Sequence, residues 1–285
     1  MRETSSLVSS AWLAEHLNAP DLRIVDATWH MPGGGRDARG DYEAAHIPGA
    51  VFFDIDEIAD TQCGLPHMLP PLEKFSARVR RLGLGDGCRI IVYDNSDYRT
   101  AARVWWMFRV FGHQDVAVLD GGLQKWRDEG RPVNDIPPPP RERHFTARAD
   151  HSRVRDLAQM LANLASGREQ VVDARARDRF AGDAPEPRPG VRAGHIPGSR
   201  NLPFTALYHA DGTMKAPPAL ARLFTEAGVD LGRPIVTSCG SGVTACSLAL
   251  ALELVGHRQV AVYDGSWSEW GSQEHTPIAT GQAPS

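Results

Sequence analysis

The 285-residue sequence predicts two tandem α/β domains, each a mainly parallel sheet flanked by helices on both faces. Three observations lead to this prediction. Segments of the first half recur in the second, short apolar β-branched runs alternate with helix-forming segments, and a stiff proline-rich stretch, Ile136–Arg141, lies between the halves. We expect a first domain over 1–135, a linker over 136–149 and a second domain over 150–285.

The internal repeat extends along most of the chain. Val118–Gly122 matches Val262–Ser266 at an offset of 144 residues (262 − 118). His46–Ala50 matches His195–Ser199 at an offset of 149 residues (195 − 46). Because the offset changes by only a few residues, the pattern indicates a duplicated domain with small insertions in its loops. The repeated histidines are expected to form turns.

Both copies are expected to have the same order of elements. A helix precedes a short strand that ends at Asp26 in the first copy and at Asp173 in the second. A His-Ile-Pro-Gly turn, a second helix, a central strand, a loop, a long helix and a last strand follow. The first two helices of each copy are expected over 10–17 and 72–82, and over 152–164 and 219–227. Parallel sheets of this kind bind ligands at the carboxyl ends of their strands.

A strand, a glycine loop and a helix follow one another in the second copy. Ile235–Thr237 is a β-branched apolar run, and 245–254 is rich in good helix formers. Between them, Gly240 and Gly242 are expected to let the loop curl with positive φ. Cys239 opens this loop. Because the N-terminus of a helix stabilises anions, a thiolate is favoured there.

Cys239 is therefore expected to be a nucleophile rather than a structural cysteine beside a tight turn. The hydroxyl groups of Ser241 and Thr244 add hydrogen-bond donors to the loop. Cys246 lies inside the following helix and is expected to be a small core residue. The sequence argues against a cysteine phosphatase. Such enzymes carry a Cys-x5-Arg loop, and Ala245 stands where the phosphate-binding arginine would be.

The first copy lacks this nucleophile. Applying the offset of 144 residues to Cys239 gives Asn95 (239 − 144), which cannot form a thiolate. The first domain is thus expected to be catalytically silent and to shape a substrate cleft for the second.

Composition excludes several other classes of protein. The net charge is −4 and the pI is about 6.3, which gives no indication of a nucleic-acid or membrane partner. No apolar run approaches the ~20 residues of a membrane span. The N-terminal residues lack the apolar segment of a signal peptide. The four cysteines show neither metal-ligand spacing nor a disulfide framework, so we expect no metal, no cofactor and a reducing cytoplasm.

The motifs Arg103–Phe108, His195–Gly198 and Tyr263–Trp270, in this tandem layout, resemble the two-domain sulfurtransferases of the rhodanese superfamily. The resemblance covers nearly the whole chain. Thiosulfate-using members typically carry Cys-Arg-Lys-Gly-Val-Thr, whose cations suit a dianionic donor. The loop Cys239–Thr244 reads Cys-Gly-Ser-Gly-Val-Thr instead and is similar to that of mercaptopyruvate-using members.

The resemblance also implies roles for individual residues. Arg179 and Arg188 would bind the carboxylate and keto oxygen of the donor, although a solvated charged loop is the alternative. Ser241 would form a proton relay with His67 and Asp56, although His67 could instead only pack a domain interface. Gly240, Gly242, Val243 and Thr244 would line the substrate site around Cys239.

The resemblance implies a two-step sulfur transfer. The thiolate of Cys239 would take sulfur from 3-mercaptopyruvate as a persulfide, release pyruvate, and pass the sulfur to a thiol, thioredoxin or cyanide. Two alternatives stay open: a thiosulfate:cyanide sulfurtransferase, and a non-catalytic module that docks a partner or senses redox state. The loop around Cys239, which the first copy lacks, argues against the non-catalytic module.

Overall fold

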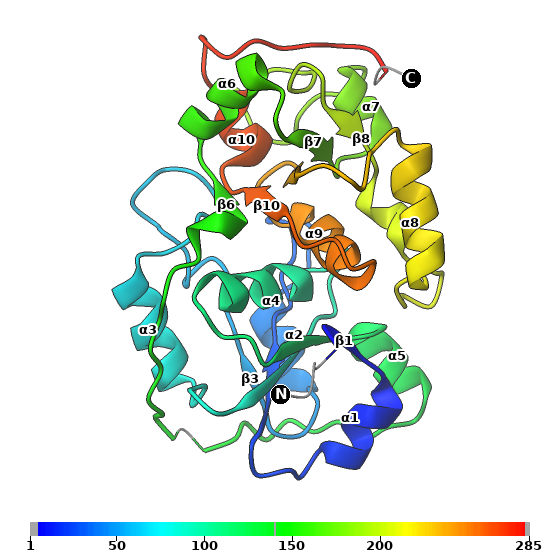
Figure 1. The fold of residues 1–285 in the computed structure, drawn as a ribbon. Helices are drawn as coiled ribbons and strands as arrows, with labels where there is room; N and C mark the ends of the chain where they lie inside the picture. Colours follow the sequence, from blue (N-terminus) through cyan, green and yellow to red (C-terminus); the bar gives the residue numbers. More distant parts are fainter. Residues whose placement is uncertain (1–4, 140, 283–285) are drawn as a thin grey trace. The chain divides into compact units, whose positions relative to one another are not determined.

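The computed structural model describes residues 5–139 and 141–282, and the chain divides into two compact units (Figure 1). Unit 1 comprises the described residues up to Asp60, Leu69–Asp150 and Ala210–Met214. Unit 2 comprises Thr61–Met68, His151–His209 and the described residues from Lys215 onward. Two short segments therefore belong to the unit of the opposite half of the chain.

Unit 1 contains a five-stranded, fully parallel sheet of order β1-β5-β4-β2-β3 with flanking helices. Its strands are β1 (Leu7–Val8), β2 (Leu22–Asp26), β3 (Ala50–Phe52), β4 (Arg89–Tyr93) and β5 (Val116–Leu119). Its helices are α1 (Ser10–His16), α2 (Ala38–Ala44), α3 (Leu72–Arg81), α4 (Ala101–Val110) and α5 (Gly122–Asp128).

Unit 2 repeats this sheet with the order β6-β10-β9-β7-β8. Its strands are β6 (Val154–Arg155), β7 (Gln170–Asp173), β8 (Arg200–Asn201), β9 (Ile235–Ser238) and β10 (Val260–Tyr263). Its α-helices are α6 (Leu157–Ser166), α7 (Arg177–Ala181), α8 (Pro217–Glu226), α9 (Ala245–Leu254) and α10 (Ser266–Trp270), and its 3₁₀ turns are η1 (His151–Arg153) and η2 (Phe204–Leu207). The predicted pair of parallel α/β domains is confirmed.

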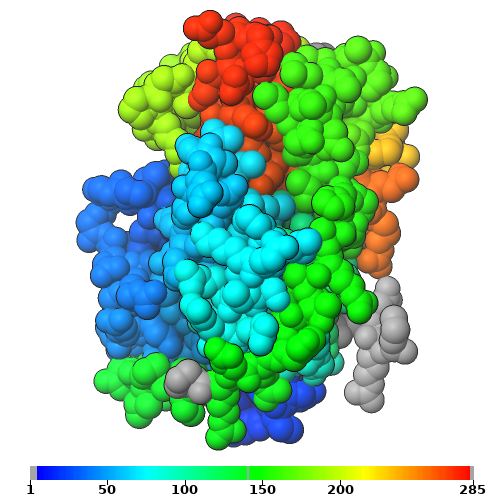
Figure 2. All heavy atoms as spheres, turned by 90° about the vertical axis from the view of Figure 1, so that its left-hand side faces the viewer, coloured from blue at the N-terminus to red at the C-terminus, as the bar shows by residue number. Residues whose placement is uncertain are grey.

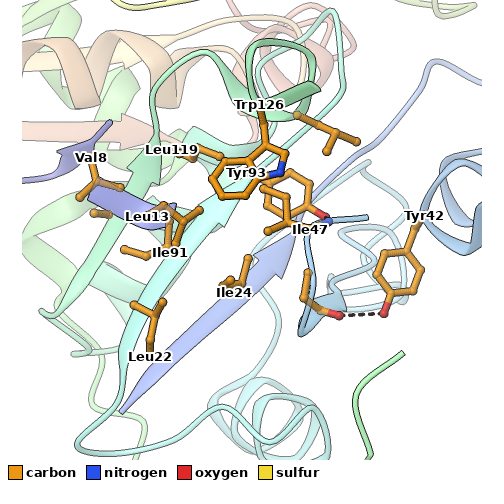
Figure 3. Close-up of a cluster of buried hydrophobic side chains, with 13 residues drawn as sticks. Val8, Leu13, Leu22, Ile24, Tyr42, Ile47, Ile91, Tyr93, Leu119 and Trp126 are labelled. Carbon is orange, nitrogen blue, oxygen red and sulfur yellow. Dashed lines mark hydrogen bonds between the residues drawn. The ribbon is translucent and has the colours of Figure 1, made fainter. Parts of the chain in front are cut away.

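The central strand of each sheet is buried on both faces. All four residues of β9 are buried, as are the last four of β4, which is typical of parallel sheets covered by helices on both sides. In unit 1, Ile91 and Tyr93 pack with Leu13 and Trp126 in the cluster drawn in Figure 3. In unit 2, the fully buried Trp270 is part of the corresponding cluster. Each unit therefore has its own apolar core beneath the loops that follow its strands.

Strand register changes the expected correspondence between the two halves. Asp26 of β2 pairs with Tyr93, and Asp173 of β7 pairs with Ser238. Tyr93 and Ser238 are thus equivalent, at an offset of 145 residues (238 − 93). The residue after Tyr93 is Asp94, so Asp94 and not Asn95 is the structural counterpart of Cys239. The offset of 144 holds again from helix α4, because the loop of unit 2 is one residue shorter.

The first helix of the second copy begins later than expected. Instead of a helix from Ser152, the turn η1 and the edge strand β6 come first. Asp156 then caps α6 by accepting from the backbone N–H of Gln159 at 2.8 Å, and the Gln159 side chain accepts from the N–H of Asp156 at 3.0 Å. This capping box fixes the start of the helix at Leu157.

The segment predicted as a linker packs against unit 1 after its prolines. Phe145 is buried, and its carbonyl accepts a hydrogen bond from the Ser76 hydroxyl of α3 at 2.9 Å. The N–H of Arg143 donates to the carbonyl of Arg80 at 3.3 Å. In Figure 2 this stretch runs in green beside the cyan surface of α3.

The described residues contain neither a membrane-spanning helix nor a cluster of metal ligands. None of the helices there has the length and apolar character needed to cross a membrane. The same part of the chain holds no group of three or more histidine, cysteine or acidic side chains that could bind a metal ion.

Candidate active site

The loop from Cys239 to Thr244 joins β9 to α9 at the carboxyl end of the sheet. Cys239 follows the last strand residue directly and is 1% exposed. Five backbone N–H groups of this loop and of the first residue of α9 donate to no acceptor within the described part of the chain. They belong to Gly240, Ser241, Val243, Thr244 and Ala245. We call these five groups the N–H cradle. They supply hydrogen-bond donors for an anion at the N-terminus of a ten-residue helix.

The two loop glycines have different reasons to be glycine. Gly242 has a φ of +75°, a conformation that L side chains rarely adopt, as the sequence predicted. Gly240 is not among the residues with positive φ, so that expectation was wrong. Its constraint is space, because a Cβ atom at Gly240 would lie 3.3 Å from Nη2 of Arg179. Gly240 thus lets an arginine approach the residue next to Cys239.

Two arginines, one just before α7 and one on it, share the carboxylate of Glu186, which follows the helix. Arg179 lies on α7, and its Nη2 and Nε donate to the Glu186 carboxylate at 2.5 and 3.3 Å. The other Glu186 contact is Nη1 of Arg175 at 2.8 Å. The Glu186 side chain is 4% exposed and that of Arg179 is 27% exposed. Glu186 therefore holds Arg179 in place while leaving part of its guanidinium open.

Arg175 anchors this ion-pair network in the interior. Its guanidinium binds both carboxylate oxygens of Asp173 at distances of 2.7 to 3.1 Å and lies 4.4 Å from the ring centroid of Trp267. Burial alone would lower the pKa of Arg175, but the neighbouring Asp173 and Glu186 carboxylates raise it above its ordinary value. Arg175 therefore stays charged and serves as structural support.

Residues at the start of α10 hold the backbone of the loop. The N–H of Cys239 donates to the Ser266 hydroxyl at 3.1 Å, and its carbonyl accepts from the N–H of Trp267 at 2.9 Å. The carbonyl of Gly240 accepts from the N–H of Ser268 at 2.8 Å and from the Ser268 hydroxyl at 2.6 Å. Three consecutive residues therefore fix the peptide groups on both sides of Cys239.

The remaining predicted site residues lie in different parts of the chain. Ser241 is buried in the loop, and Arg188 is partly buried between α7 and β8. His67 belongs to unit 2, is buried, and has a φ of +59°. Asp56 belongs to unit 1, where its carboxylate accepts from Nε1 of Trp29 at 2.7 Å. The donor contacts of Arg188 and the relay of Ser241, His67 and Asp56 stay predictions.

The other cysteines and the repeated histidines have structural environments. Cys246 is fully buried in α9, and its Sγ donates to the carbonyl of Gly242 at 3.2 Å. All four cysteines are free. His195 is buried, donates from Nδ1 to the carbonyl of Phe180 at 2.8 Å, and stacks on the ring of Phe180 with the ring centroids 3.8 Å apart. His46 stacks in the same way on Tyr42.

Sequence reasoning missed four residues that support the site: Arg175, Glu186, Ser266 and Ser268. Only Ser266 left a signal in the sequence, because the matching position of the first half is Gly122. A serine where the repeat has a glycine marks a backbone position with unusual φ. The other three show their partners only in the folded chain.

Comparison with known proteins agrees with this layout. The family model of the rhodanese-like domain matches residues 9–129 and again 156–273. The human 3-mercaptopyruvate sulfurtransferase is 46% identical over 271 residues, covering 93% of this chain and 91% of that protein. The thiosulfate sulfurtransferase of Cricetulus griseus is also 46% identical, over 275 residues, covering 94% of this chain and 92% of that protein.

Solved structures give the same result. The Tum1 protein of Saccharomyces cerevisiae matches with a TM-score of 0.90 at 30% identity, covering 97% of this chain and 98% of that chain. SseA of Escherichia coli, described as a 3-mercaptopyruvate sulfotransferase, matches with a TM-score of 0.85 at 38% identity, covering 93% and 99%. The chain belongs to the rhodanese family and is a two-domain sulfurtransferase.

Proposed function

We propose that this sulfurtransferase uses 3-mercaptopyruvate as its donor and carries the sulfur as a persulfide on Cys239. The observation that carries the proposal is the charge around the loop. Cys239–Thr244 contains no cation, and the guanidinium beside Gly240, that of Arg179, is already paired with Glu186. Such a site suits a donor with one carboxylate better than a dianion, since a dianion needs more positive charge close to the sulfur.

The proposed reaction begins with attack by the Cys239 thiolate on the thiol sulfur of mercaptopyruvate. The new S–S bond forms as the C–S bond breaks, and the electron pair leaves with the enolate of pyruvate. A proton delivered through Ser241, with His67 and Asp56 as the proposed relay, converts the enolate into pyruvate. A thiol, thioredoxin or cyanide then attacks the outer sulfur and regenerates the Cys239 thiolate.

Arg179 and Arg188 are proposed to hold the donor. Nη1 of Arg179 donates to no acceptor within the described part of the chain, because Glu186 takes Nε and Nη2. A planar α-keto carboxylate matches the end of a guanidinium that is fixed in this way. The N–H cradle would stabilise the negative charge of the persulfide, as oxyanion holes stabilise oxygen anions.

Thiosulfate is the second candidate donor, because relatives named thiosulfate sulfurtransferase reach the same 46% identity as those named for mercaptopyruvate. A plant relative carries both names.

The cytoplasmic location predicted from the sequence stays part of the proposal. It is supported by the four cysteines, which are all free, as is usual in a reducing compartment.

The deciding experiment measures kcat/KM for both donors on three proteins. Wild type is expected to prefer mercaptopyruvate. Arg179→Ala should weaken mercaptopyruvate use by about 1.5–3 kcal/mol, the contribution of a charged hydrogen bond. Gly240→Arg combined with Ser241→Lys should shift the donor ratio towards thiosulfate, since opposite charges at ~4 Å gain about 1–4 kcal/mol at effective dielectrics of 80 to 20.

A wild type that prefers thiosulfate would overturn the donor assignment. An unchanged donor ratio in the double variant would overturn the charge argument. Arg179→Lys, which keeps the charge but loses the planar fork, serves as the matched variant and should recover only part of the loss in Arg179→Ala.

A further inference from the structure

We infer that Ser266 is a positioning residue that fixes the backbone of Cys239 for sulfur transfer. Its side chain is fully buried, and its φ is +50°, in the left-handed region. The Ser266 hydroxyl accepts from the N–H of Cys239 at 3.1 Å and donates to the carbonyl of Tyr263 at 2.8 Å. The hydroxyl therefore links the end of β9 to the end of β10. The inference rests on the proposed role of Cys239 as the nucleophile.

The internal repeat shows that the fold does not need a serine here. Gly122 occupies the matching position of unit 1, with a φ of +60°. A Cβ atom at Gly122 would lie 2.5 Å from the carbonyl oxygen of Asp94, so unit 1 has no room for a side chain. Non-glycine residues in the left-handed region are disfavoured, because Cβ comes too close to the following carbonyl oxygen. Unit 2 thus retains a disfavoured conformation at a position where glycine would satisfy the backbone.

The function of the hydroxyl follows from what it binds. With the N–H of Cys239 held by Ser266 and its carbonyl held by the N–H of Trp267, the peptide groups on both sides of Cα are fixed. The direction of the Cα–Cβ bond is then fixed as well, so Sγ can change its position relative to the N–H cradle only by rotation about that bond. Small displacements of a nucleophile lower the rate of attack strongly.

The test compares Ser266→Gly with Ser199→Ala. Ser266→Gly removes the hydroxyl and relieves the strained φ. Ser199 is a matched control, because it is 1% exposed and its hydroxyl donates to the carbonyl of Ile196 three residues earlier at 2.7 Å, as Ser266 does to Tyr263. Three quantities are measured: the melting temperature, kcat and KM with mercaptopyruvate, and the rate of Cys239 alkylation by iodoacetamide between pH 5 and pH 9.

Ser266→Gly is expected to keep the melting temperature near that of wild type while kcat falls by about 10–100-fold and KM changes little. Its alkylation of Cys239 should slow or move to higher pH. Ser199→Ala should leave alkylation and kcat unchanged. Alkylation needs no sulfur donor, so this readout is independent of the donor assignment, whereas turnover by Cys239→Ser would contradict the proposed nucleophile itself.

Two results would overturn the inference. One is a Ser266→Gly protein that alkylates and turns over like wild type. The other is an equal loss in Ser199→Ala, which would show a general effect of removing a buried hydroxyl. Ser266→Ala, which removes the hydroxyl but keeps Cβ, provides the second variant: it should share the loss of kcat and alkylation, and normal alkylation per folded molecule would also contradict the inference.

Discussion

The loop after β4 and the loop after β9 begin at the same place in the same kind of sheet, yet the first encloses a carboxylate and the second a thiol. In unit 1, Asp94 accepts from the N–H of Ala101 at 2.7 Å and from the N–H of Ser96 at 3.0 Å. Burial raises the pKa of Asp94, against the lowering effect of these hydrogen bonds. The loop after β4 therefore holds a carboxyl group of its own at the N-terminus of α4.

In unit 2 the same donors have no internal acceptor. The N–H of Ala245, the counterpart of Ala101, donates to no protein group in the described residues, and neither do the other members of the N–H cradle. The loop is also one residue shorter. The comparison teaches that the fold provides a set of N–H donors for an anion in both halves. In unit 1 the side chain of Asp94 accepts from them, whereas in unit 2 they are left for the proposed thiolate or persulfide of Cys239.

The largest effect is expected when the thiol that distinguishes the loop of unit 2 is removed. Cys239→Ser should abolish sulfur transfer and leave the fold intact, because the exchange is nearly isosteric but removes the atom that forms the persulfide. Intact-mass measurement after donor addition should show about +32 Da on wild type, one sulfur, and no increment on the variant.

Three cysteine variants serve as controls for this prediction. Cys63→Ser, Cys88→Ser and Cys246→Ser should each retain most of the activity per folded molecule, although Cys88 and Cys246 are buried and their replacement can lower stability. Substantial turnover by Cys239→Ser, or a mass increment on it, would place the nucleophile elsewhere.

The next largest effect is expected when the carboxyl group that distinguishes the loop of unit 1 is removed. Asp94→Ala should lower the free energy of unfolding by about 1–3 kcal/mol, because the buried N–H groups of Ser96 in the loop and of Ala101 at the start of α4 lose their acceptor. Asn95→Ala is the matched variant, and as a partly exposed loop position it should change stability by less than about 0.5 kcal/mol. Chemical denaturation measures both. Equal effects would argue against Asp94 as the counterpart of Cys239.

The smallest effect concerns the loop glycines. Gly240→Ala places a Cβ atom 3.3 Å from Nη2 of Arg179, so the guanidinium must move by a few tenths of an ångström. We expect KM for mercaptopyruvate to rise about two- to fivefold, equivalent to less than about 1 kcal/mol, with little change in melting temperature. Gly242→Ala should instead lower stability, by about 1–2 kcal/mol, because of its positive φ. A loss of stability in Gly240→Ala together with a raised KM and normal stability in Gly242→Ala would contradict the assignment of a space constraint to Gly240 and a positive φ to Gly242.

The sequence contained enough information for the architecture and for the strand–loop–helix segment that carries Cys239. Repeated motifs and β-branched runs depend on local composition, so they predicted both sheets and the loop around Cys239. Strand register could not be predicted, because a one-residue difference in loop length shifts the offset without changing any motif. The offset of 144 residues therefore points to Asn95, whereas strand pairing gives Asp94 as the counterpart of Cys239. Long-range partners such as Glu186 for Arg179 also need the folded chain, since nothing in the sequence pairs one charge with another.

The short outer strands have a consequence for how such a duplicated chain folds. Two sheets with the same strand order in one polypeptide could exchange partners during synthesis, which is a common failure of repeat proteins. The outer strands of unit 2 have two residues each, and those of unit 1 have two and three. Edge strands this short expose few unpaired backbone N–H and C=O groups to a strand of the other sheet or of another molecule. Short edge strands therefore limit misassembly and aggregation before the central strands have paired within their own sheet.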